Sequence, residues 1–155
     1  MQPTLYMLIG LPGSGKSTWT DKLFKTESVD AIILSTDNYV QVWADDENST
    51  YDEVFPKAIA SATSQLDFWV RHCKKFNISA VWDQTNLTAK SRAKKLRQLP
   101  NHRKVAVVFQ ADTETLQQRR ANRPGKTIPQ HVLNHMKLEM PSLDEGFDEI
   151  ILVNA

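Results

Sequence analysis

The amino-acid sequence predicts an α/β fold in which one parallel sheet of about five strands has helices on both faces. Short apolar runs alternate along the chain with longer segments of helical periodicity, which is the pattern of strand–helix–strand units. The apolar runs are nearly continuous rather than alternating with polar residues, which is typical of strands buried on both faces. The length of 155 residues predicts a single domain over residues 1–155 with a core that needs no disulfide.

The expected strands cover residues 4–9, 31–35, 78–82, 104–109 and 149–153. Helices are expected over residues 17–25, 55–76 and 88–99, from Asp112 or Thr113 to about 122, and again from Pro129. Thr88 is expected to cap the third of these, and the polar segment 45–51 to form a surface loop. Apolar residues at three- and four-residue spacing predict one buried face of the long helix: Phe55, Ile59, Ala62, Leu66, Trp69, Cys73 and Phe76. Trp19, Trp69 and Trp82 are expected in the core.

Composition excludes several classes of protein. Hydrophobic residues make up 41% of the chain and charged residues 24%, which argues against a disordered or low-complexity chain. The N-terminus lacks the features of a secretory signal, and no apolar run approaches the about 18 residues of a membrane span. The lone Cys73 indicates a reducing compartment, so we expect a cytoplasmic protein (host cytoplasm if phage-encoded) with no membrane partner and predict no oligomeric state.

Charge is unevenly divided along the chain. Residues 84–140 carry 12 basic and 3 acidic residues, whereas residues 1–83 carry 7 basic and 11 acidic ones. Residues 141–155 carry 4 acidic and no basic residues. The basic segment thus lies between two acidic ones, which indicates an anionic ligand, although a solvated helix face explains the pattern equally well. The same two interpretations, a track for a nucleic-acid backbone or a soluble face, stay open for the basic helix over 90–97.

Residues 10–17 read G-L-P-G-S-G-K-S and match the phosphate-loop pattern G-x-x-x-x-G-K-[ST]. Glycines let successive backbone N–H groups converge on phosphate oxygens at a helix N-terminus. In this pattern Lys16 reaches the β- and γ-phosphates and Ser17 binds Mg²⁺, so ATP or GTP binding is predicted. The residues of this pattern expected to hold the nucleotide are Gly10, Pro12, Gly13, Ser14, Gly15, Lys16 and Ser17.

Two acidic residues follow expected strands. Asp37 comes after the second strand and Asp83 after the third, and ligands of open parallel sheets bind beyond these strand ends. A carboxylate there can hold Mg²⁺ or accept a proton from an attacking hydroxyl. A helix cap or a surface ion pair is the alternative for each acid alone.

Three arginines, Arg119, Arg120 and Arg123, flank a break at Pro124-Gly125. Arginines on such a segment can close over the γ-phosphate and neutralise charge in the transition state. The alternative is a basic helix end favoured by the helix dipole.

Other residues give weaker indications. Tyr39 and Trp43 are suited to stack on a base, although core packing is expected for at least one of them. His131 and His135 lie four residues apart without the glutamate of the metalloprotease pattern. A surface pair is therefore expected rather than a metal site.

Four segments carry a resemblance to a known family: Gly10–Trp19, Ser35–Tyr39, Asp83–Leu87 and Arg123–Met136. Over nearly its whole length the chain resembles the kinase domain of bacteriophage-type polynucleotide 5′-hydroxyl kinases, within the D-x-T-N group of P-loop kinases. This resemblance implies the P-loop kinase fold and Mg²⁺ and ATP as cofactors, with Lys16, Ser17 and Thr18 holding them. It further implies Asp37 as general base, Asp83 at the metal or acceptor site, and Arg123 on the transferring phosphoryl group, with Arg119 a weaker candidate.

The chain departs from the phage kinases at two positions. These kinases carry an arginine immediately before the base and another three residues after it, where this chain has Thr36 and Val40. The phosphatase domain often fused to such kinases is also not found in the sequence. Three functions are therefore consistent with the sequence. The protein is a kinase of the 5′-hydroxyl of DNA or RNA, a kinase of a nucleoside or other small molecule, or a nucleotide-binding switch or toxin-like module.

Overall fold

The computed structural model describes residues 2–154, which form one five-stranded parallel sheet in the order β2-β3-β1-β4-β5. The strands are β1 (Thr4–Ile9), β2 (Ile32–Leu34), β3 (Ala80–Asp83), β4 (Arg103–Gln110) and β5 (Glu149–Asn154). Every neighbouring pair is parallel. The α/β prediction is confirmed, and each expected strand is present within two residues of its predicted bounds.

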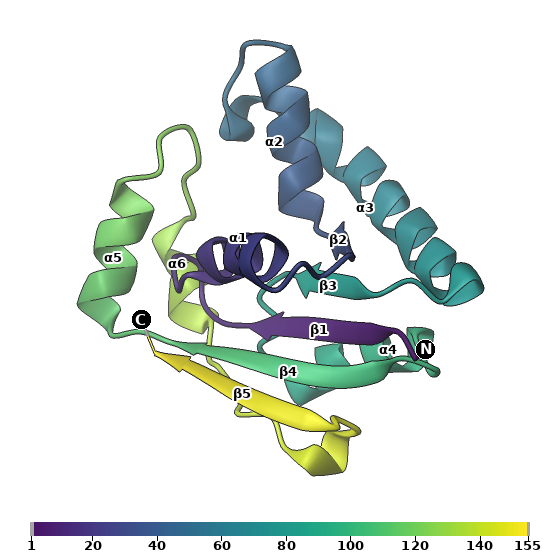
Figure 1. Cartoon of the computed structure of the whole chain (residues 1–155). Coiled ribbons are helices and arrows are strands. Elements are labelled where there is room, and N and C mark those ends of the chain that lie inside the picture. Colours follow the sequence, from purple (N-terminus) through teal and green to yellow (C-terminus); the bar gives the residue numbers. More distant parts are fainter. Residues whose placement is uncertain (1, 155) are drawn as a thin grey trace.

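The helices are α1 (Lys16–Thr26), α2 (Thr36–Asp46), α3 (Tyr51–Phe76), α4 (Ala89–Gln98), α5 (Thr113–Ala121) and α6 (Gln130–His135), followed by the 3₁₀ turn η1 (Leu143–Glu145). Figure 1 shows α1 in front of the sheet and α4 behind it, with α2 and α3 paired beyond the β2 edge. No helix within residues 2–154 is long and apolar enough to cross a membrane.

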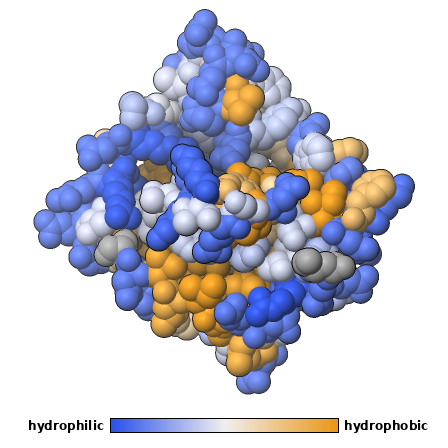
Figure 2. All heavy atoms as spheres, in the orientation of Figure 1, coloured by the Kyte–Doolittle hydropathy of each residue, from blue (hydrophilic) through white to orange (hydrophobic). Residues whose placement is uncertain are grey.

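The two faces of the sheet bury alternate residues of each strand, as the two-residue period of a strand requires. On one face, Leu5 and Met7 of β1 pack in a cluster with Cys73 of α3 and Leu96 of α4. On the other face, Leu8 packs in a second cluster with residues of α1. In Figure 2 apolar side chains remain visible over β4 and β5, which α1 does not cover.

The α2–α3 pair differs from the sequence prediction. Residues 36–46 form a helix that was not expected, so the predicted loop 45–51 shrinks to residues 47–50. Phe55, Trp69 and Phe76, expected to be buried, are exposed by 38%, 38% and 56%. The reason is that α3 has two partners: α2 covers its N-terminal half and the sheet covers its C-terminal half. The buried face of the helix therefore includes Val54 and Val70 instead.

Cys73, by contrast, is fully buried as expected. Burial raises the pKa of its thiol to about 11.

Side-chain caps fix the starts of four helices, α2, α3, α4 and α5. Ser35 Oγ accepts from the backbone N–H of Asn38 at 3.1 Å, so α2 begins immediately after β2. The predicted cap at Thr88 is confirmed for α4, and Asp112 is the cap of α5. The first of these caps places Asp37 in the first turn of α2, directly beyond the sheet.

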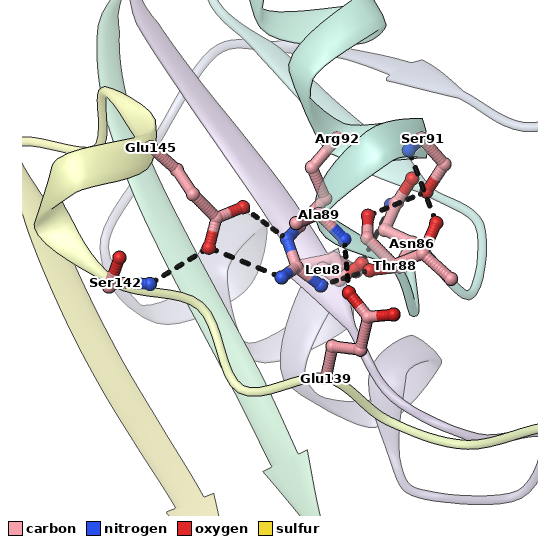
Figure 3. A network of polar contacts seen from close by, with 9 residues as sticks. All are labelled: Leu8, Asn86, Thr88, Ala89, Ser91, Arg92, Glu139, Ser142 and Glu145. Carbon is pink, nitrogen blue, oxygen red and sulfur yellow. Dashed lines mark hydrogen bonds and ion pairs between the residues drawn. The ribbon is translucent and has the colours of Figure 1, made fainter.

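A buried ion pair fastens the C-terminal segment to α4 (Figure 3). The fully buried Arg92 donates from Nε and Nη2 to Glu145 at 2.8 and 3.2 Å, and from Nη1 to the carbonyl of Asn86 at 3.0 Å. Arg92 is thus one basic residue of 90–97 that faces the protein interior, and the choice between a nucleic-acid track and a soluble face stays open for the exposed ones. The pair also holds the loop that follows β3, which carries part of the site described below.

Replacing Glu145 by alanine leaves the Arg92 guanidinium buried and unpaired, so Glu145→Ala should lower the free energy of unfolding by about 3–5 kcal/mol. Glu149→Ala is the matched control, because Glu149 pairs with Arg103 at 3.4 Å on the exposed surface and should cost at most about 1 kcal/mol. Urea denaturation followed by circular dichroism measures both. An equal decrease in the free energy of unfolding of the two variants would contradict the assignment of Arg92–Glu145 as a structural pair.

Candidate active site

The loop between β1 and α1 is shaped to surround an anion. Gly13 and Gly15 have φ values of 85° and 99°, the left-handed region that favours glycine. A Cβ at Gly10 would lie 2.5 Å from Ser14 Oγ and 2.9 Å from Phe109 Cβ, so only glycine fits there. Ser14 Oγ is buried and has no hydrogen-bond partner within residues 2–154. The curved, glycine-rich backbone of this loop is therefore the conformation expected where phosphate oxygens bind. The Ser14 hydroxyl is also available to bond to such an oxygen.

Lys16 is the first residue of α1 and bends back along the same loop. Its Nζ donates to the carbonyls of Gly10 and Leu11 at 2.8 and 3.3 Å. Burial lowers the pKa of Lys16 to about 8, against the opposing fields of Asp83 and Asp37. The ammonium thus lies between the phosphate loop and the acidic strand ends.

The loop after β3 is bonded directly to the end of β1. Gly10 N donates to the carbonyl of Thr85 at 3.0 Å, and Asn86 Nδ2 donates to the carbonyl of Leu8 at 2.7 Å. Asn86 is buried, with a positive φ of 48°, a conformation that asparagine tolerates better than most residues. The asparagine of the D-x-T-N segment therefore has a structural role: it holds the ends of β1 and β3 in register.

Asp37 is held by two side chains that the sequence did not single out as functional. Tyr51 Oη donates to Oδ1 at 2.7 Å, and Lys126 Nζ donates to Oδ2. Burial alone would raise the pKa of Asp37, but the bonds from Lys126 and Tyr51 hold it below its ordinary value. Asp37 is therefore a carboxylate at neutral pH. Tyr51 was expected in a surface loop, and Lys126 directly follows the Pro124-Gly125 break.

Asp83 ends β3 and lines the same cavity as Ser17 and Asp37. Burial raises the pKa of Asp83, although Lys16 opposes this effect. Carboxylate and hydroxyl oxygens are the ligand atoms that Mg²⁺ prefers. A divalent cation beside Asp83 would offset the cost of burying its charge, so Ser17 and Asp83 fit the metal role predicted for them.

The three arginines divide into two groups. Arg119 Nη1 and Arg120 Nη1 donate to the carbonyls of Gly13 and Pro12, at 3.1 and 3.2 Å, and so hold the phosphate loop. Arg123 is exposed, lines the cavity and lies 6.0 Å above the centre of the Tyr51 ring. All three arginines line the cavity, and among residues 2–154 Arg123 is the one of them with no hydrogen bond to the phosphate loop. Its role on the phosphoryl group, and that of Arg119 in nucleotide binding, stay predictions.

The segment 123–128, which we call the lid, is fastened to the start of α3. Asp52 N donates to the carbonyl of Gly125 at 2.9 Å, and Thr127 N donates to Asp52 Oδ2 at 2.8 Å. The lid, the phosphate loop and the strand ends together bound a cavity of about 710 Å³. The structure thus brings the predicted Lys16, Ser17, Asp37, Asp83 and Arg123 to one cavity.

The weaker candidates lie elsewhere. Tyr39 and Trp43 pack against the α2–α3 cluster and do not line this cavity, so base stacking by them is not supported. His131 and His135 belong to no group of three or more possible metal-binding side chains among residues 2–154.

The pKa of Lys16 gives a pH dependence that can be measured. As pH rises through about 8, Lys16 loses its proton and its attraction for phosphate, so the affinity for Mg-ATP should fall. Titration calorimetry between about pH 6.5 and about 9.5 measures this. The arginine of Lys16→Arg stays charged throughout this range, so the affinity of this variant for Mg-ATP should not fall with pH. A wild-type affinity that is flat across this range would contradict the assignment.

Comparison with known proteins agrees with this geometry. A family profile described as an AAA domain (AAA_33) matches residues 5–143. A sugar kinase from Janibacter sp. HTCC2649 superposes with a TM-score of 0.66 at 16% identity, covering 98% of this chain and 85% of that one. A gluconokinase from Sinorhizobium meliloti 1021 superposes with a TM-score of 0.57 at 19% identity, covering 98% of this chain and 82% of that one.

A third solved structure extends the comparison. The shikimate kinase from Acinetobacter baumannii, in complex with shikimate, gives a TM-score of 0.55 at 15% identity and covers 100% of this chain and 86% of that one. The chain therefore belongs to this AAA-domain family and has the fold of P-loop kinases.

Proposed function

We propose that the protein is a Mg-ATP-dependent kinase that transfers the γ-phosphoryl group to a hydroxyl of a small molecule. The observation that carries the acceptor class is the lid, which is bonded to α3 beside Asp37 and lines the cavity next to this carboxylate. Structural neighbours that are kinases of sugars, gluconate and shikimate support the same class.

Each predicted side chain has a role in this reaction. The phosphate loop and Lys16 would hold the triphosphate, and Ser17 and Asp83 would hold Mg²⁺, which neutralises phosphate charge when bound. Asp37 is the general base that takes the proton of the acceptor hydroxyl, with its carboxylate fixed by Tyr51 and Lys126. Arg123 stabilises the charge that develops on the transferring group. Phosphoryl transfer depends mostly on such positioning and charge neutralisation.

Two positions argue for a small acceptor over a polynucleotide. Val40 is fully buried between α2 and α3, and Thr36 Oγ1 accepts from Gln84 Nε2 at 3.3 Å. Neither position offers a cation to the phosphate that follows a 5′-terminal nucleoside. A small polyol or sugar needs no such contact.

A polynucleotide 5′-hydroxyl end is the second candidate. It is favoured by the arrangement of Asp37, Asp83 and Arg123 around one cavity, which is what the resemblance to phage kinases implies. The lid would have to detach from α3 to admit a strand end.

An acceptor panel tests the proposal. Transfer of labelled γ-phosphate should occur to members of a set of sugars, sugar acids and nucleosides, and should be far slower to a 5′-hydroxyl oligonucleotide. Lys16→Ala serves as the inactive control. Transfer to the oligonucleotide alone would establish the second candidate, and Mg-ATP binding without transfer to any acceptor would indicate the switch-like alternative.

Arg123 should matter for chemistry more than for binding. Arg123→Ala should lower kcat by about 10³–10⁵ while changing the KM for ATP much less, because the free guanidinium acts on the transition state. Arg97→Ala, an exposed arginine on α4, is the control and should retain wild-type rates. A wild-type kcat in Arg123→Ala would remove Arg123 from the mechanism.

A further inference from the structure

A second cavity, of about 420 Å³, adjoins the first on the far side of the loop after β3. Gln84 and Thr85 line both cavities, so they form the wall between them. The remaining polar walls come from the loop before α4, from α4 itself and from the end of α6 with the chain that follows it: Asn86, Thr88, Ser91, Lys95, His135 and Lys137. None of the lining residues is acidic.

Lys95 is the unusual member of this set. Its ammonium donates to Asn86 Oδ1 and lies 5.4 Å above the Trp82 ring centre. No carboxylate among residues 2–154 forms an ion pair with it, and burial lowers its pKa to about 8. Withdrawing a cation from water without a counter-charge is costly. The kinase roles assigned above do not account for this cost.

The surroundings add positive charge and hydrogen-bond donors. Lys137 is exposed at the cavity wall. Glu139 Oε2 already accepts from Ala89 N at 2.9 Å, as Figure 3 shows beside Thr88 and Ser91. The start of α4 therefore attracts a carboxylate, as helix N-termini do. Glu139 does not line the cavity, and within residues 2–154 it forms no ion pair with Lys95 or Lys137.

We propose that this second cavity binds an anionic group, phosphate or carboxylate, carried by the alcohol that the kinase phosphorylates. The inference rests on the proposed function, because it assigns one end of the acceptor to Asp37 and the other to Lys95 and Lys137. Gln84 and Thr85, which both cavities share, directly follow Asp83 in the chain. An acceptor that extends along these two residues would place its hydroxyl in the first cavity and its anionic group in the second.

Inorganic phosphate tests the cavity independently of catalysis. With Mg-ADP saturating the first cavity, titrating phosphate should shift the ¹H–¹⁵N resonances of Thr88 and Ser91. The apparent Kd should rise about tenfold in Lys137→Ala, and likewise in Lys95→Met if that variant stays folded. Lys90→Ala, an exposed lysine of the same helix outside the cavity, should leave the Kd unchanged. Unshifted resonances would overturn the subsite and leave the proposed kinase activity intact.

A matched pair of acceptors tests the source of the anion. The value of kcat/KM should be higher for a sugar acid than for the matching neutral sugar. The ratio of the two values should fall about tenfold in Lys137→Ala. Phosphate binding without any preference between the two sugars would overturn the acceptor assignment, because the cavity would then bind a free anion. Phosphate binding without transfer to any small acceptor would overturn the proposed function and, with it, the acceptor assignment.

Discussion

Two hydrogen bonds between the ends of β1 and β3 are the constraint on which the site depends. Asn86 Nδ2 bonds to the carbonyl of Leu8, and Gly10 N bonds to the carbonyl of Thr85. The phosphate loop begins at one of these strand ends and Asp83 ends the other. Because Gly10 and Asn86 are both buried, the distance between the phosphate loop and Asp83 is set by the sheet itself and not by a flexible loop.

The acceptor side of the site is held by charge rather than by the sheet. Lys126 reaches from the lid to Asp37 on α2, and Asp52 on α3 bonds back to the lid. The lid therefore lines the cavity beside Asp37 and, through Lys126, keeps the pKa of this carboxyl low. Under the proposed function, this contact explains why a lysine far from Asp37 in sequence would belong to the catalytic arrangement.

Much of this site was predictable because its signals are local. The phosphate loop is a contiguous motif, and Asp37 and Asp83 each follow an apolar run. The buried face of α3 was predicted wrongly at Phe55 and Trp69, because periodicity reports a repeat but not whether α2 or the sheet covers it. Tyr51 and Lys126 could not be found in this way, since each meets Asp37 only through tertiary contact.

The central claim is that Asp37 takes the acceptor proton while the phosphate loop holds the donor, and a single-turnover experiment separates these two roles. With enzyme in excess over labelled Mg-ATP and a small-molecule acceptor present, Asp37→Asn should slow phosphoryl transfer by about 10²–10⁴. Its affinity for Mg-ATP should stay within about twofold of wild type, because within residues 2–154 the side chain of Asp37 is bonded to Tyr51 and Lys126 and not to the phosphate loop. Transfer at the wild-type rate in Asp37→Asn would contradict the account.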